Sequence, residues 1–203
     1  MNNFKKSPIY PVIFMVILSF ILTFLLAALY GFTEPIAKFN EDIELKGKIL
    51  DVFSVELENM EAETIDKTFN ENIEISEFNS KPLYILKENG NDAAYAVPFA
   101  GPGLWGEIDG YVGVNSGLNE ILGIQFTKQS ETPGLGARIE ENEYRDQYRD
   151  IDISSSDLGN YVINKPAPGG NIDAISGATQ TSDAVVNMVN EDLANFIQTK
   201  GGN

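Results

Sequence analysis

Cysteine and histidine are both absent from this chain of 203 residues. Without cysteine there is no thiolate ligand for zinc or an iron–sulfur cluster, and no disulfide can form. Without histidine there is no imidazole to act as a general base or as an axial haem ligand. Any redox chemistry in this chain must therefore use an organic cofactor.

Positive charge is also scarce, because 14 lysines and arginines face 30 aspartates and glutamates, for a net charge of −16. The first 30 residues contain two lysines and no acidic residue, so the remainder carries −18. Such a body repels nucleic acid and anionic headgroups, and we expect no nucleic-acid partner. The content of glycine and proline is ordinary for a folded domain.

One long apolar run occurs, at residues 9–30, and it contains no charged side chain. At 1.5 Å per residue a helix of this length spans roughly 30 Å of hydrocarbon, which predicts a transmembrane helix in the lipid bilayer. The alternative is a cleaved signal peptide, with Lys5 and Lys6 as its basic start and Ala27-Ala28 near the cut.

The charges around this run predict its orientation. Lys5 and Lys6 precede it, whereas Glu34 and further acidic residues follow it closely. By the positive-inside rule the N-terminus is then cytoplasmic, and everything after residue 33 lies outside the cell membrane.

The chain divides into three expected parts. Residues 1–33 form the cytoplasmic N-terminus and membrane helix, and residues 34–80 form a helical stalk and a surface region. Pro35 begins the stalk helix in this interpretation, because proline suits a first helical turn. The acidic stretch 57–80 has weak periodicity and receives no assigned elements. Residues 81–203 form the main domain.

The main domain is expected to be α+β, with a partly covered antiparallel sheet packed by helices. Its last helix is predicted over 181–198, where apolar residues recur at three- and four-residue steps and would cover the sheet. A charged helix is expected over 140–148, and a loop over 165–171. Short β-rich runs predict the strands, at 83–86, 94–97, 110–114 and 121–126, with a hairpin turn at 115–120.

The segment before the last helix combines small residues, hydroxyls and free backbone amides, from Asp173 to Ser182. The first N–H groups of a helix have no intrahelical partner and the macrodipole there is positive, so this place stabilises a phosphate. The alternative is an ordinary N-cap formed by Thr179, Thr181 or Ser182.

The string Asp173-Ala-Ile-Ser176-Gly177-Ala178-Thr179 resembles the Asp-x-x-(Ser/Thr)-Gly-Ala-Thr flavinylation motif of the FMN-binding domain family. The resemblance implies that the Thr179 hydroxyl is esterified to the phosphate of FMN. It also implies a flavin transferase that uses FAD and magnesium and reads this string, with Asp173 as part of the signal.

Two further segments resemble the same family, Glu131-Thr-Pro-Gly-Leu-Gly136 and the Gly-Leu104-Trp105 segment. A turn with two glycines can bring backbone against a flat ring, although a plain tight turn has the same sequence. The indole of Trp105 could stack on the ring or fill the core. The implied FMN-binding residues are Thr179, Asp173, Ser176, Gly177, Ala178, Thr181, Glu131, Thr132, Gly134, Leu135, Gly136, Leu104 and Trp105. Lys165 either neutralises the phosphate or is simply solvated.

Members of this family occur as the G subunit of Rnf and the C subunit of the sodium-pumping NADH:quinone oxidoreductase (Nqr). The resemblance implies an electron relay, of the Rnf type slightly more than the Nqr type, with flavin- and iron–sulfur-bearing membrane proteins of the same complex as partners. The chain itself would not pump ions, because no acidic or basic residue lies between Lys6 and Glu34. The alternatives are a solitary flavinylated extracytoplasmic electron-transfer protein and a cofactor-free anchored assembly module.

Overall fold

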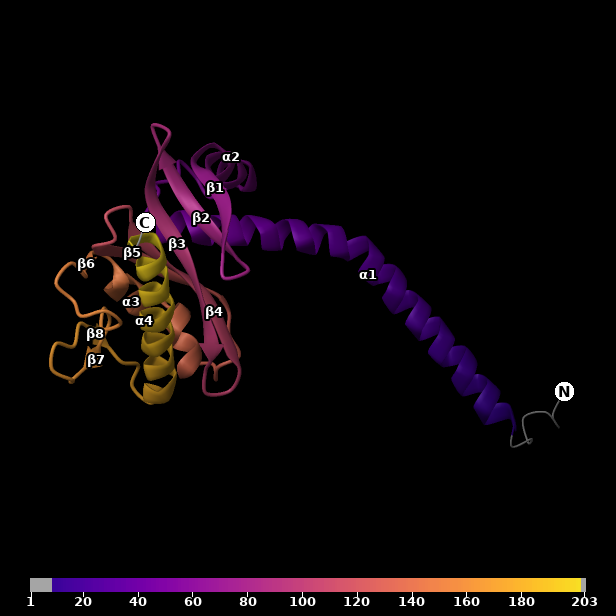
Figure 1. The fold of residues 1–203 in the computed structure, drawn as a ribbon. Helices are drawn as coiled ribbons and strands as arrows, with labels where there is room; N and C mark the ends of the chain where they lie inside the picture. Colours follow the sequence, from indigo (N-terminus) through magenta and orange to yellow (C-terminus); the bar gives the residue numbers. More distant parts are fainter. Residues whose placement is uncertain (1–8, 202–203) are drawn as a thin grey trace. The chain divides into compact units, whose positions relative to one another are not determined.

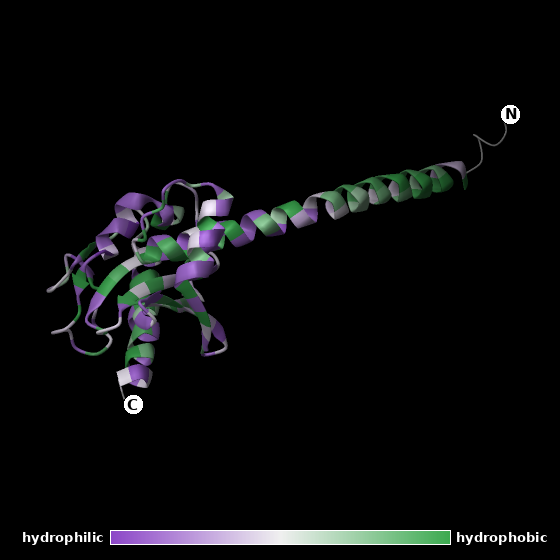
Figure 2. Ribbon diagram, turned by 90° about the horizontal axis from the view of Figure 1, so that it is seen from above, coloured by the Kyte–Doolittle hydropathy of each residue, from purple (hydrophilic) through white to green (hydrophobic). Residues whose placement is uncertain are grey.

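The computed structural model describes residues 9–201, so Lys5 and Lys6 of the predicted orientation signal lie outside the described residues. Contacts divide the chain into two units, residues 1–43 and 44–203. Helix α1 (Ile9–Val52) begins in the first unit and ends in the second. By length and composition it could cross a membrane, and none of its most apolar stretch is buried. Figure 2 shows this stretch mostly in the green of hydrophobic residues.

Pro35 lies inside α1 and does not begin a separate helix, so that prediction is wrong. An interior proline removes one hydrogen-bond donor and crowds the carbonyl four residues earlier. The helix nevertheless continues as one element on both sides of Pro35. The hydroxyl of Thr33 also donates to the carbonyl of Leu29 at 3.1 Å, which supplies one carbonyl in this stretch with an additional donor.

The second unit contains one antiparallel sheet in which the strands follow each other in chain order (Figure 1). The four predicted strands and the turn at 115–120 are present. The acidic stretch 57–80, for which the sequence predicted no elements, contains α2 (Ala62–Asn72) and the first strand. The main domain was predicted to begin at residue 81, and this position falls inside the sheet. The strands are β1 (Ile73–Phe78), β2 (Lys81–Glu88), β3 (Asn91–Pro102), β4 (Glu107–Asn115), β5 (Glu120–Lys128) and β6 (Ile151–Asp152).

Helices cover both faces of this sheet, whereas the sequence predicted a sheet that is only partly covered. Helix α4 (Thr179–Gly201) packs on one face, where the ring of Phe196 lies 5.3 Å from that of Tyr95. Helix α2 packs on the other face, where Phe69 lies 5.8 Å from Tyr84. Four consecutive residues of β2, from Leu83 to Leu86, are therefore buried. A strand covered on both sides is apolar throughout rather than alternating.

The last turns of α1 belong to the second unit and pack into it. Ile49, Leu50 and Val52 are fully buried. The guanidinium of Arg149 donates to the carboxylate of Asp51 at 3.0 Å and to its carbonyl at 3.1 Å. These bonds supply a C-terminal carbonyl of the helix with a donor and fix the end of α1 to the head.

The connection from β5 to α4 is compact but mostly irregular. The predicted charged helix consists of three short pieces, η2 (Gly136–Glu140), α3 (Asn142–Arg145) and η3 (Asp146–Tyr148). The predicted loop at 165–171 separates two short parallel strands, β7 (Asn164–Lys165) and β8 (Ile172–Asp173). Residue Asp173 of the flavinylation-like string thus ends a strand, and Thr179 begins α4.

Candidate functional site

The string 173–179 folds as a tight turn before α4. The N–H of Ala178 donates to the carbonyl of Ile175 at 2.9 Å, and Gly177 has a φ of +80°. A φ of this sign is strained for a residue with a Cβ, so glycine is required there. Ile175 and Ala178 are buried, whereas Ser176 and Thr179 are exposed. The turn therefore anchors its apolar residues and presents its hydroxyls to solvent.

Ser182 fixes this turn from the first helical turn of α4. Its hydroxyl accepts from the N–H of Ile175 at 3.0 Å and donates to the carbonyl of Ala178 at 3.2 Å. It is fully buried. Sequence reasoning missed this positioning role, because the hydroxyl reaches seven residues back in the chain. A serine shortly after such a string is the signal that could have suggested it.

Thr179 is the first residue of α4, and Ala178 provides the carbonyl that accepts the first helical bond, from the N–H of Ser182 at 3.0 Å. The N-cap position is thus Ala178, and none of Thr179, Thr181 and Ser182 is the N-cap residue. Within residues 9–201 no hydrogen bond of the Thr179 side chain is found. Its hydroxyl is exposed at a helix N-terminus, where unpaired N–H groups attract a phosphate.

The other two motif segments meet this helix start through Glu131. One carboxylate oxygen accepts from the Thr181 hydroxyl at 2.7 Å. The other accepts from the backbone N–H of Trp105 at 2.9 Å. Glu131 and Thr181 are both buried. The tertiary structure therefore brings the three segments, which are far apart in the sequence, into one place.

Apolar side chains lie exposed around this place. Trp105 is 70% exposed, so the alternative in which its indole fills the core is wrong. Leu104 and Leu135 are 49% and 44% exposed. Leu135 lies beside the turn, because a Cβ built on Gly177 would be 3.2 Å from a methyl of Leu135. Large exposed apolar side chains clustered beside a polar anchor are typical of a ligand or partner surface.

The two glycines of the 131–136 segment serve different purposes. Gly134 has a φ of +74° and open space around it, so it is required for the backbone conformation. Gly136 is buried, and a Cβ there would lie 2.7 Å from both Glu131 Oε2 and Thr181 Oγ1. Gly136 is therefore required for close packing. Thr132 is exposed on the same turn and accepts a bond through its carbonyl from the N–H of Leu135 at 3.1 Å.

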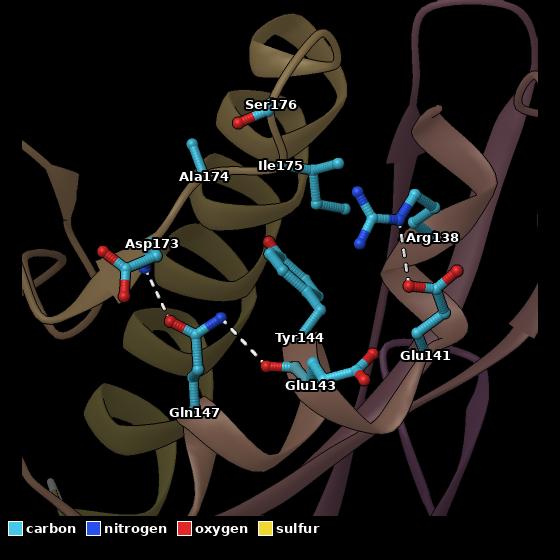
Figure 3. Close-up of a pocket in the computed structure, with 9 residues that line it drawn as sticks. All are labelled: Arg138, Glu141, Glu143, Tyr144, Gln147, Asp173, Ala174, Ile175 and Ser176. Carbon is cyan, nitrogen blue, oxygen red and sulfur yellow. Dashed lines mark hydrogen bonds and ion pairs between the residues drawn. The ribbon is translucent and has the colours of Figure 1, made fainter. Parts of the chain in front are cut away.

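Asp173 and Ser176 line a hollow of about 200 Å³ on the flank of the turn (Figure 3). Gln147 accepts from the Asp173 N–H at 2.7 Å, and Arg138 pairs with Glu141 at 2.9 Å. Lys165 pairs with the Asp173 carboxylate at 3.1 Å. The charge of Lys165, a candidate phosphate partner from the sequence, is therefore partly neutralised. The sequence patterns did not single out Gln147 and Arg138.

Two tyrosines support the wall of this hollow. Tyr144 and Tyr148 are buried with their hydroxyl oxygens 3.0 Å apart. Burial raises the pKa of Tyr144 to about 12 and the pKa of Tyr148 well above its ordinary value. Both therefore remain neutral at physiological pH and act as packing groups. In the described part of the chain no cluster of carboxylates could hold a metal ion.

Comparison with known proteins identifies the family that this region resembles. Residues 103–194, which include all three motif segments, match the model of the FMN-binding domain. The chain is 38% identical over 104 residues to the G subunit of the ion-translocating oxidoreductase complex of Methanosarcina acetivorans, covering 51% of this chain and 52% of that protein. It is 33% identical over 134 residues to the C subunit of the Na(+)-translocating NADH-quinone reductase of Chlamydia pneumoniae, covering 56% of this chain and 42% of that protein.

A solved structure supports the fold. The crystal structure of the C subunit of the Na(+)-translocating NADH-quinone reductase from Parabacteroides distasonis superposes with a TM-score of 0.66 and 27% identity. The match covers 80% of this chain and 94% of the solved one. This chain spans about half the length of the two curated relatives given above.

Proposed function

Since residues 103–194 match the FMN-binding domain, we propose that the chain carries FMN esterified through its phosphate to Thr179 and relays electrons in a membrane complex. One observation carries the proposal. The exposed Thr179 stands at the N-terminus of α4, and Glu131 joins this helix start, through Thr181, to the segment of the exposed Trp105. A phosphate anchor next to an apolar surface suits a phosphorylated, flat aromatic ligand.

The attachment is a phosphoryl transfer from FAD. The Thr179 oxygen bonds to the phosphorus of the FMN half and loses its proton, while the pyrophosphate bond of FAD breaks and AMP leaves. A flavin transferase with magnesium would catalyse this step, since the chain itself lacks histidine and Thr179 has no hydrogen-bonded base among the described residues. The exposed members of the string, Asp173, Ser176 and Gly177, are those that such an enzyme can contact on the folded head.

The side chains around Thr179 bind and orient the flavin. Bound FMN exchanges one or two electrons, and the protein sets its position and potential. The N–H groups at the start of α4 stabilise the phosphate. Trp105, Leu104 and Leu135 offer the apolar surface for the ring, with Gly134 allowing the turn that places Leu135.

The complex is of the Rnf or Nqr kind, with other flavin- and iron–sulfur-bearing membrane proteins as partners. We favour the Rnf kind, because identity is 38% with the relative from the ion-translocating oxidoreductase complex and 33% with the relative from the NADH-quinone reductase. Helix α1 anchors the chain in the bilayer. An ester bond suits a head outside the cell membrane, where a lost flavin could not be replaced from the cytoplasm.

The covalent flavin can be tested on the wild-type protein made together with a flavin transferase. The intact mass should exceed that of the sequence by one FMN less one water. The denatured protein should fluoresce under ultraviolet light in a gel, because only a covalent flavin survives denaturation. A protein without added mass or fluorescence would indicate a cofactor-free assembly module. Flavin on a chain that purifies without partner proteins would favour a solitary electron-transfer protein.

The orientation can be tested by protease accessibility. Lys5 and Lys6 before the apolar run, against acidic residues after it, predict a cytoplasmic N-terminus. Protease added to spheroplasts should digest the head, residues 44–203, and leave a membrane-protected N-terminal fragment. Digestion in inverted vesicles alone would place the head in the cytoplasm and contradict the proposal.

A further inference from the structure

We propose that Glu131 lowers the reduction potential of the flavin on Thr179 by holding a buried negative charge beneath it; this inference rests on the proposed function. Glu131 is 5% exposed. Both of its oxygens accept hydrogen bonds, from Thr181 and from the Trp105 backbone, as those of an ionised carboxylate do. A buried carboxylate that touches both the helix start and the tryptophan segment is placed to act on any ligand held there.

Basic side chains do not neutralise this charge in the described part of the chain. The ion pairs found within residues 9–201 do not include Glu131. The two basic residues that border the string, Lys165 and Arg138, pair with Asp173 and Glu141. Glu131 is stabilised by neutral donors, so its charge remains effective toward its surroundings.

The carboxylate is held in a fixed position by close packing. A Cβ built on Gly103 would lie 2.5 Å from Glu131 Oε1, and one built on Gly136 would lie 2.7 Å from Glu131 Oε2. Glycine at both positions leaves the space that the carboxylate fills. The charge therefore has one defined place between Gly103, which directly follows β3, and the start of α4.

This place lies directly under the apolar surface proposed for the ring. The carboxylate contacts the backbone of Trp105, whose indole is exposed, and packs on Gly136, which follows the exposed Leu135. Thr181, its other partner, is two residues after Thr179. Glu131 is thus one layer below the side chains that would contact the flavin.

A negative charge in this layer opposes the addition of electrons to the flavin. Charges buried in protein interact more strongly than charges in water, and salt screens them less. The oxidised flavin ring is neutral, and reduction increases its electron density. Glu131 therefore destabilises the reduced form relative to the oxidised form, which lowers the potential.

The experiment measures the midpoint potential of the flavin-loaded protein by spectroelectrochemistry. In Glu131→Gln the size of the side chain is kept, the amide oxygen can still accept from Trp105, and the amide nitrogen can donate to Thr181. The potential should move to more positive values. In Thr181→Val the charge stays but loses one donor that stabilises it, so the potential should move to more negative values.

A second readout separates charge from structure. Trp105 is the only tryptophan of the chain, so its emission in the flavin-free protein reports the position of its segment. The emission maximum of Glu131→Gln should equal that of wild type. An unchanged or more negative potential in Glu131→Gln, or a shift accompanied by altered Trp105 emission, would overturn the proposal. Intact mass identifies flavin loading first, so a wild-type protein without flavin would count against the proposed function instead.

Discussion

Replacing Thr179 by valine should abolish covalent flavin completely, because valine keeps the branched shape of the side chain and removes the only atom that can form the ester. Thr179 is exposed, and its hydroxyl makes no hydrogen bond among the described residues. The fold should therefore be unaffected, with a free energy of unfolding within about 0.5 kcal/mol of wild type. Intact mass and in-gel fluorescence after denaturation measure the loss, and urea unfolding measures the stability.

Thr199→Val provides the matched control for this substitution. Thr199 is an exposed threonine in the last turns of the same helix, where its hydroxyl donates to the carbonyl of Asn195 at 2.8 Å. This variant should carry one FMN like wild type. If Thr179→Val retained denaturation-resistant fluorescence, or if peptide mapping placed the flavin on another hydroxyl, the assignment of the ester to Thr179 would be wrong.

Gly136→Val should destabilise the head and disturb the flavin surroundings. Its Cβ would lie 2.7 Å from two buried oxygens, those of Glu131 and Thr181, and neither side chain can leave without losing its hydrogen bond. Overpacking of this kind costs about 2 to 3 kcal/mol. We expect a loss of this size in urea unfolding, together with a changed visible spectrum of the bound flavin. Attachment at Thr179 should persist, because the string 173–179 keeps its own turn.

Gly134→Ala is the comparison variant. Gly134 lies two residues before Gly136 on the same turn, but a Cβ there would meet open space. Its cost comes only from the φ of +74°, about 1 kcal/mol. Its flavin spectrum should stay close to that of wild type. Equal stability losses and equal spectra for the two variants would contradict the close packing of Gly136 on Glu131.

The elements that follow from local patterns were predicted from the sequence. A long uncharged apolar run gives a helix able to span a membrane, and short β-rich runs give four of the strands. The last helix was found from its apolar spacing, and the structure extends it to start at Thr179. Composition and spacing predict these elements because both depend only on residues that are neighbours in the chain. The acidic stretch before residue 80 lacks this periodicity, and β1 was missed.

The resemblance of three short segments to one family selected the candidate residues, but their arrangement depends on the tertiary structure. Glu131 meets Thr181 across 50 residues of sequence and the Trp105 backbone across 26. No local pattern encodes such contacts, because they depend on how the sheet and α4 pack. The exposure of Trp105 was likewise decided by packing, since the sequence left open whether its indole fills the core.

The sequence by itself determined the acidic body, the apolar helix, most of the sheet and the string that ends at Thr179, because each depends on composition or on neighbours in the chain. The tertiary structure alone decided that Ser182 holds the turn and that a buried carboxylate joins three distant segments. The physical reason is that hydrogen bonds and close contacts between distant residues form only after the sheet and helices have packed.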